Sequence, residues 1–210
     1  VRECRWGGME NTGATTLYEG CWAVGEGEQD DLIVHELAHQ WMGDLLTCKS
    51  WEHLWLNEGW ATYTEALWFE HVGGRQGYLE TVRNFLESQQ ENNQASAPGD
   101  PGMQSNRYNH PDDRFGIADD VYSKGAFVLH MLREHLGDEV FFKATRKYID
   151  QYKYTVVETD NFRHVLEAVS GKNLEQFFEQ PDLVEQFERR GMHRVAAKIA
   201  EEIGVLFENR

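Results

Sequence analysis

Cysteine and long apolar runs are scarce in this 210-residue sequence, and each shortage argues against a class of protein. Cys4, Cys21 and Cys48 are odd in number and form no C-x-x-C pair, so we interpret them as idle or buried thiols. No apolar run approaches the roughly 20 residues of a membrane span, so none is expected in this chain. No leader precedes the first motif, but the chain opens on Val1, so the sequence indicates no compartment.

Positive charge is scarce as well, with 20 Lys and Arg residues against 36 Asp and Glu residues and a formal net charge of -16. Such a chain offers no basic face to a phosphate backbone, which argues against nucleic acid as a partner. The 7 Trp, 8 Tyr and 11 Phe residues nevertheless indicate a folded globular protein. The length suits one core, so a single catalytic domain is the simplest prediction.

The sequence pattern predicts a mainly helical fold that begins with a β-hairpin. Residues 5–9 and 14–18 are short and extended in character and are joined by a turn at residues 11–13. Asp30 and Asp31 can cap a helix that ends near Gly43, and a second helix is expected from residues 54–57 to Gly73 and Gly74. Further helices are expected at 125–135, 140–152, 161–169 and 174–178, with two more after Pro181 that are split at Gly191.

A long polar segment interrupts this helical pattern. Residues 87–115 are aperiodic and marked by Pro and Gly, and they therefore predict a surface loop. Loops of this length are often functional.

A metal-binding pattern lies on the first predicted helix. His35, Glu36 and His39 form an H-E-x-x-H sequence, and the spacing of four residues places both imidazoles on one face. Such a pair is typical of a zinc site, and Glu36 flanks the ion as a candidate general base. A catalytic zinc needs a third protein ligand. Glu58, at the start of the second helix, is predicted to supply it, with one Zn²⁺ per chain.

Glu65 follows Glu58 by seven residues, and two helical turns return it to nearly the same face. Its carboxylate could therefore orient a ligating imidazole. The alternative is an ordinary acid on a helix surface.

Three motifs, in the same order along the chain, resemble those of the zinc aminopeptidases of the gluzincin clan, which include the membrane alanyl aminopeptidases and leukotriene hydrolase. They are GGMEN at residues 7–11, HELAHQW at 35–41 followed by NEG at 57–59, and YSKG at 122–125. The resemblance implies a thermolysin-like catalytic domain over residues 1–180. It also implies that His35, His39 and Glu58 bind zinc and that Glu36 is the base.

The resemblance implies two further roles. Tyr122 would donate a hydrogen bond to the oxyanion of the tetrahedral intermediate, whereas spacing alone would equally suit a core tyrosine. Glu10 would hold the free ammonium of a peptide substrate that lies along the backbone beside it. Without the resemblance, the paired glycines would be taken for a hairpin turn. The implied substrate-binding set is Gly7, Gly8, Met9, Glu10 and Asn11.

The sequence also departs from this family. Members carry a β-rich domain before the first motif, and no such stretch precedes it here. After Gln180, Pro181 opens a charged segment that we interpret as a helical tail of unknown role over residues 181–210.

The leading prediction is a zinc-dependent aminopeptidase that acts on peptides with a free N-terminus. A thermolysin-type endopeptidase would share the metal motif but would have no use for an ammonium-binding acid. The third hypothesis is a scaffold that is catalytically weak because its chain is shortened. Measuring both the metal content and the turnover of the chain separates this hypothesis from the first.

Overall fold

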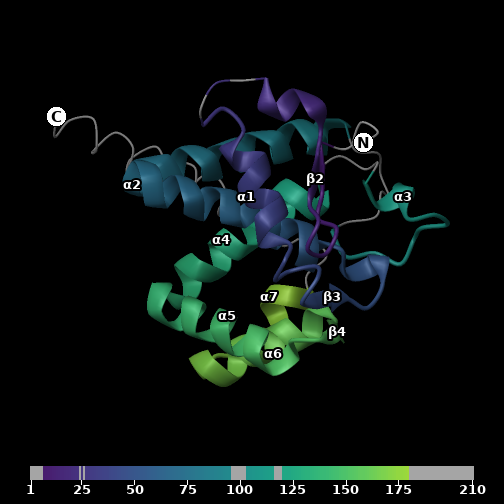
Figure 1. Ribbon diagram of the computed structural model, residues 1–210. Helices are drawn as coiled ribbons and strands as arrows, with labels where there is room; N and C mark the ends of the chain where they lie inside the picture. The colour runs from purple at the N-terminus through teal and green to yellow at the C-terminus, as the bar shows by residue number, and fades with distance from the viewer. Residues whose placement is uncertain (1–6, 24, 26, 96–102, 116–119, 180–210) are drawn as a thin grey trace, which may run out of the picture.

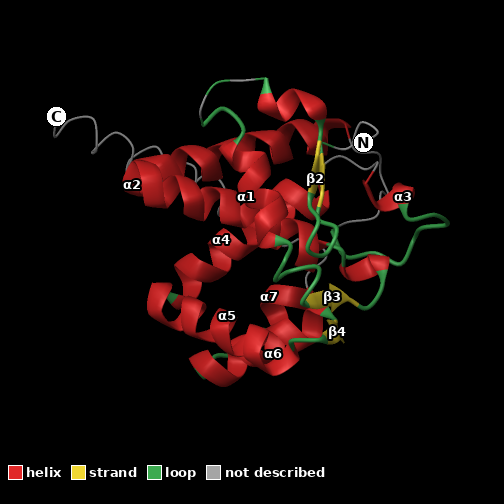
Figure 2. Cartoon of the chain, in the orientation of Figure 1, coloured by secondary structure: helices red, strands yellow, loops and turns green. Residues whose placement is uncertain are grey.

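The computed structural model describes residues 7–23, 25, 27–95, 103–115 and 120–179 of the chain (Figure 1). Helices dominate, and the strands form two small sheets of two strands each (Figure 2). This confirms the predicted fold class. The helices predicted after Pro181 lie outside the described residues. None of the helices within the described ranges is long and apolar enough to cross a membrane.

The N-terminal hairpin is present as predicted. Strand β1 (Gly8–Met9) pairs antiparallel with β2 (Thr16–Leu17). The amide of Ala14 donates to the carbonyl of Asn11 at 2.7 Å and closes the turn. A short 3-10 helix, η1 (Glu19–Trp22), follows.

Helix α1 (Asp30–Ala38) carries the metal motif but ends earlier than predicted. The amides of Gln40 and Trp41 bond to carbonyls three residues back, at 3.2 and 3.0 Å, so the chain tightens into a turn after Ala38. Gly43 then adopts a φ of 150°, which favours glycine. The predicted end near Gly43 is therefore wrong by about one helical turn.

The caps of α1 also differ from the prediction. Gln29 is the N-cap residue and makes no side-chain cap, whereas Asp30 and Asp31 lie in the first turn. The Asp30 carboxylate instead accepts a hydrogen bond from the Trp68 indole at 3.1 Å. Both acids still favour the helix because they face the positive end of its dipole.

Helix α2 (Trp55–Ala95) is longer than predicted. Strand β3 (Leu46–Cys48) and the 3-10 turn η2 (Trp51–His53) lead into it. Gly74, with φ 66° and ψ -163°, breaks the helix axis at the predicted end, but the helix resumes and continues to Ala95. The first nine residues of the predicted loop at 87–115 are therefore helical.

The C-terminal half follows the predicted order of helices. A short helix α3 (Asp112–Phe115) and a π-helical turn η3 (Asp120–Lys124) precede α4 (Gly125–Leu136). Strand β4 (Thr155–Val157) pairs in parallel with β3, a contact that the sequence did not predict because each of the two strands has only three residues. The remaining elements are α5 (Asp138–Tyr152), β4 (Thr155–Val157), α6 (Thr159–Ser170) and α7 (Glu175–Glu179).

The buried core lies mainly between α2 and α4 and extends to α5 and α6. Figure 1 shows α1 and α2 in the upper part of the view and α5, α6 and α7 in the lower part. Helices α2 and α4 approach backbone to backbone, since a Cβ added to Gly59 would lie 2.8 Å from the Cα of Gly125. This close approach sets the π-helical turn beside the start of α2, where Glu58 lies.

Candidate metal centre

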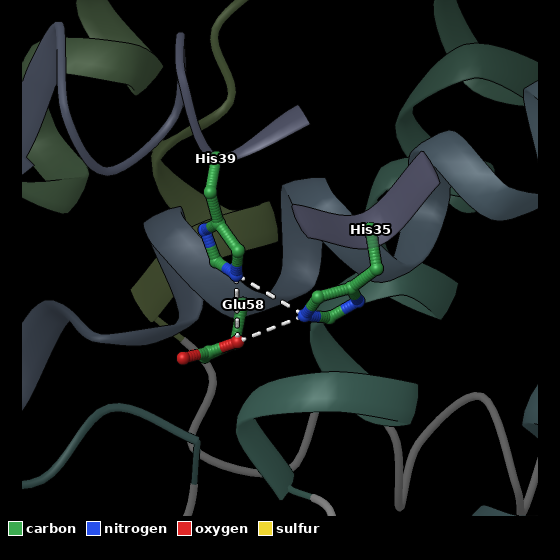
Figure 3. Close-up of side chains that lie close together, drawn as sticks. All are labelled: His35, His39 and Glu58. Atoms are coloured by element: carbon green, nitrogen blue, oxygen red, sulfur yellow. Dashed lines mark hydrogen bonds and ion pairs between the residues drawn. The ribbon is translucent and has the colours of Figure 1, made fainter. Parts of the chain in front are cut away.

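Three side chains from two helices meet at one point (Figure 3). His35 extends from α1, His39 is the C-cap residue of the same helix, and Glu58 extends from the first turn of α2. The Nε2 atom of His39 lies 3.1 Å from that of His35 and 3.2 Å from Oε2 of Glu58, and the third separation, His35 Nε2 to Glu58 Oε2, is 3.3 Å. All three residues are at least nine-tenths buried. The predicted ligand set is thus brought together.

These separations fit a metal ion. In a tetrahedral zinc site with bonds of about 2.0–2.1 Å, neighbouring ligand atoms lie roughly 3.3 Å apart. Two imidazole nitrogens and one carboxylate oxygen are also a donor set that zinc accepts. Among the described residues, His35, His39 and Glu58 form a group able to hold an ion.

The electrostatics of the three groups favour a cation at their centre. Burial opposes charge on His35, but the carboxylates of Glu58 and Glu65 outweigh it and raise the His35 pKa to about 10. Burial likewise opposes charge on Glu58, but hydrogen bonds with His35 and His39 lower the Glu58 pKa to about 2. The site therefore holds an ionised carboxylate in a dry setting, where it needs positive charge.

The other nitrogen of each imidazole is held by a separate acceptor. Nδ1 of His35 lies 2.8 Å from Oε1 of Glu65, and Nδ1 of His39 lies 3.0 Å from the carbonyl oxygen of Met42. If each Nδ1–H donates to its acceptor, both Nε2 lone pairs point to the common centre. The contact with Glu65 was anticipated from its spacing. The Met42 contact was not, because it arises from the early end of α1.

Glu36 lies beside the three ligand residues with one oxygen free to act. The side chain is 5% exposed, and Oε2 has no hydrogen-bond partner within the described part of the chain. Burial raises the pKa of Glu36 above its ordinary value, against the lowering effect of His35 and His39. A Cβ at Gly8 would overlap the Glu36 carboxylate, so β1 passes directly over this group.

The hairpin brings only part of the predicted substrate-binding set to the centre. Gly8, Met9 and Glu10 line the same cavity as the metal ligands, which has a volume of about 930 Å³. Gly7 and Asn11 instead hold the hairpin itself: the Gly7 carbonyl accepts from the Tyr18 amide at 2.8 Å, and the Asn11 amide group donates to Thr16 at 3.2 Å.

Tyr122 lies on the π-helical turn η3 and also lines the cavity. Its ring stacks near that of His35, with centroids 6.0 Å apart and an interplanar angle of 26°. Irregular turns of this kind are frequent at functional sites because they redirect a side chain out of a regular helix. The phenol therefore lies next to the metal ligands, although it is 64 residues beyond Glu58 in the chain.

Several cavity residues escaped the sequence interpretation. They come from β3, η2 and the segment around α3, which have no motif and no helical periodicity, and they include Thr47, Cys48, Trp51, Leu54, Pro111 and Phe115. Cys48 is half-buried and free, and burial together with the charges of Glu58 and Glu10 raises its pKa to about 11. Cys21 is buried and free, and Cys4 lies outside the described residues.

The sequence is similar to a family of known peptidases. Residues 1–180 match the peptidase family M1 domain. Aminopeptidase N of Lactococcus lactis is 32% identical over 215 residues, which cover 97% of this chain and 24% of that protein. Aminopeptidase M1-B of rice, Oryza sativa, is 36% identical over 181 residues, covering 79% of this chain and 20% of that protein.

Solved structures of the same kind resemble the fold. The M1 zinc metallopeptidase from Deinococcus radiodurans gives a TM-score of 0.64 at 27% identity, covering 84% of this chain and 35% of that one. The yeast LTA4 hydrolase in complex with bestatin gives a TM-score of 0.72 at 28% identity, covering 84% of this chain and 28% of that one. The chain spans between 16 and 24% of the length of the curated relatives it matches.

Proposed function

The chain belongs to peptidase family M1, and from this premise we propose that it is a zinc-dependent aminopeptidase that hydrolyses the first peptide bond of substrates with a free N-terminus. The observation that carries the proposal is the meeting of His35, His39 and Glu58 in one cavity with Glu10 and Glu36. The first three residues supply a metal site. Glu36 supplies a base, and Glu10 supplies a carboxylate for the substrate's ammonium.

The proposal assigns one zinc ion per chain to His35, His39 and Glu58. The separations of 3.1 to 3.3 Å between their ligand atoms support it. When bound, zinc would polarise the scissile carbonyl and lower the pKa of water to near neutrality. Glu65 would keep His35 in the tautomer and orientation that binding requires.

Glu36 is the proposed general base. Its unpartnered Oε2 accepts a proton from the attacking water and passes that proton to the leaving nitrogen. The upward shift of its pKa suits this exchange, since a stronger base accepts the proton more readily. Gly8 leaves room for the carboxylate, as any side chain at that position would compete for the same space.

Hydrolysis of a panel of aminoacyl-arylamides by the purified chain, with and without a chelator, tests this function. We expect hydrolysis that stops when the metal is removed and returns when zinc is added. A metal-loaded chain that turns over none of the panel would support the scaffold hypothesis instead.

The hydroxyl of Tyr122 is proposed to stabilise the oxyanion. A phenol donates a hydrogen bond near neutral pH, and the ring of Tyr122 stacks near that of the ligand His35. We expect Tyr122→Phe to lower kcat by about 10² to 10³-fold with little change in KM, because such a donor acts mainly in the transition state. Steady-state kinetics on one arylamide measure both constants.

Tyr154→Phe provides the matched control for the Tyr122 experiment. Tyr154 is 84% exposed, does not line the cavity and should keep normal kinetics without its hydroxyl. An unchanged kcat in Tyr122→Phe would return Tyr122 to a purely structural role.

Glu10 is proposed to bind the ammonium of the substrate. A charge-assisted hydrogen bond of this kind contributes roughly 10- to 100-fold in affinity. We therefore expect the wild type to cleave free-amine peptides far better than N-acetylated ones. Glu10→Ala should shrink that preference chiefly by lowering kcat/KM for the free-amine substrate.

Glu19→Ala is a suitable control, since Glu19 is exposed on η1 and lies outside the cavity. An undiminished preference in Glu10→Ala would refute the role of Glu10. Equal cleavage of free and acetylated peptides by the wild type would favour the endopeptidase hypothesis.

A further inference from the structure

The hairpin that carries Glu10 is too small to hold itself in place. Strands β1 and β2 pair over two residues each, and a two-stranded hairpin alone in water is marginally stable at best. Glu10 directly follows β1. The position of its carboxylate therefore depends on the contacts that fasten the hairpin to the rest of the chain.

Helix α1 and the turn after it supply these contacts. A Cβ at Gly8 would overlap the carboxylate of Glu36. Two residues after Gly8, the carbonyl of Glu10 accepts a hydrogen bond from Nε2 of Gln40 at 2.9 Å. Two strand residues advance about 6.7 Å and four helical residues about 6 Å, so the two contacts are in step. The chain from residue 8 to 10 thus runs alongside the chain from residue 36 to 40.

Gln40 holds the hairpin at two points with one side chain. Its Nε2 donates to the Glu10 carbonyl, and its Oε1 accepts from the amide of Gly13, in the turn between β1 and β2, at 3.3 Å. The bond to Glu10 is partly buried, whereas the bond to Gly13 is exposed, where water can replace it. The bond to Glu10 therefore contributes more to holding the hairpin.

The turn after α1 couples this clamp to the metal centre. The amide of Gln40 bonds to the carbonyl of Leu37 at 3.2 Å, which tightens the chain around His39. The ring of His39 contacts Glu58, and the side chain of the next residue, Gln40, contacts the hairpin. Adjacent residues of one turn thus place a proposed zinc ligand and the main chain of Glu10.

A second glutamine holds the other end of the hairpin. Gln29, the N-cap residue of α1, accepts a hydrogen bond from the hydroxyl of Tyr18 at 3.1 Å. The amide of Tyr18 also donates to the carbonyl of Gly7 at 2.8 Å. Gln29 therefore anchors the hairpin at the end away from Glu10.

We infer that Gln40 is a positioning residue for substrate binding, because its hold on the Glu10 carbonyl keeps the Glu10 carboxylate where the substrate's ammonium binds. This inference rests on the proposed role of Glu10. Gln40 does not line the cavity, so it acts through Glu10. Its loss should weaken substrate binding and leave the bond-breaking step nearly unchanged.

The variant Gln40→Met tests the inference, because methionine has nearly the shape of glutamine but no donor for the Glu10 carbonyl. On a free-amine peptide, KM should rise about 3- to 10-fold with kcat within about 2-fold of the wild type. On the N-acetylated peptide, both constants should stay as in the wild type. Gln29→Met is the matched control and should keep the wild-type KM, since it loosens only the end away from Glu10.

A double variant shows whether Gln40 acts through Glu10. Glu10→Ala and Glu10→Ala/Gln40→Met should have the same KM for the free-amine peptide, because the clamp then has no carboxylate left to position. A residue that merely stabilised the fold would instead add its own effect to that of Glu10→Ala.

Hydrogen exchange of the zinc-loaded proteins gives a readout that does not require turnover. The amides of Ala14 and Tyr18 bond within the hairpin and should exchange several-fold faster in Gln40→Met than in the wild type. They should exchange at the wild-type rate in Glu10→Ala, which leaves the main-chain carbonyl in place.

An unchanged free-amine KM or unchanged hairpin exchange in Gln40→Met would overturn the inference. So would an equal rise of KM in Gln29→Met, a further rise when Gln40→Met is added to Glu10→Ala, or a loss of zinc and kcat that marks Gln40 as a residue of general stability. Failure of the proposed function would look different. A wild type that cleaves free and acetylated peptides equally, while Gln40→Met speeds hairpin exchange, would retain the clamp and refute the ammonium-binding role of Glu10.

Discussion

Replacing Glu36 with Gln is expected to lower kcat by about 10² to 10⁴-fold while leaving zinc binding intact. The side chains have nearly the same shape, but the amide cannot accept the proton that Oε2 of Glu36 is placed to take. None of the three ligand atoms belongs to Glu36, so the metal centre itself should be undisturbed. Turnover and metal content measured on the same preparation test both halves of this expectation.

A matched Glu→Gln change at Glu139, an exposed residue of α5, should leave turnover and metal content as in the wild type. Near-normal turnover by Glu36→Gln would remove Glu36 from the mechanism. Loss of zinc in Glu36→Gln would show instead that the carboxylate helps to hold the metal.

The second large effect is expected from His39→Ala. This change removes one of three ligand atoms and leaves Glu58 buried with one imidazole contact fewer. Zinc affinity should fall by more than the roughly 10- to 100-fold that loss of a ligand's hydrogen-bond partner costs. Activity should fall to the level of the chelated wild type, since two protein ligands do not make a catalytic zinc site.

Metal analysis after dialysis against a weak chelator measures this loss. His71→Ala is the control, because His71 is an exposed histidine of α2 outside the ligand group. The zinc occupancy of Glu65→Gln should lie between those of His39→Ala and His71→Ala, since Glu65→Gln weakens only the contact to Nδ1 of His35. Full zinc occupancy in His39→Ala would refute the ligand assignment.

The meeting of the three proposed metal ligands could be predicted from sequence because most of their geometry is local. His35 and His39 share one face of a helical turn by spacing alone. Glu58 was placed from its position at the start of the second helix, although residues 39–54, which include β3 and η2, separate the two helices. Glu65 lies on the same face as Glu58 by spacing as well. Tyr122 needed the family resemblance, because its approach to His35 depends on how α2 and α4 pack.

Element boundaries were less predictable where tertiary contacts overrode local signals. Gly43 was expected to end α1, but the chain turns after Ala38, where the Met42 carbonyl accepts from His39. Gly73 and Gly74 were expected to end the second helix. Gly74, with its positive φ, bends the helix axis there. The helix continues because Tyr78, Leu79 and Val82, which follow Gly74, are buried in the core.

The edge-to-face contact between Trp51 and Phe115, with ring centroids 5.9 Å apart, could not be predicted from sequence. Trp51 lies on a three-residue turn, and Phe115 lies at the end of a segment that was interpreted as a surface loop. No periodicity links them. The buried guanidinium of Arg114 donates to the backbone carbonyls of Trp51 and Met103, and bonds to backbone carbonyls leave no pattern in the sequence.

The contact between Gly59 and Gly125 bears on how freely the rest of the core can change. Glu58 precedes one glycine, and Tyr122 lies three residues before the other, so main-chain atoms in contact set the spacing between the proposed metal ligand and the proposed hydroxyl donor. Main-chain atoms cannot repack as side chains do. Apolar substitutions elsewhere between α2 and α4 can therefore accumulate over evolutionary time while the distance between Glu58 and Tyr122 stays constant.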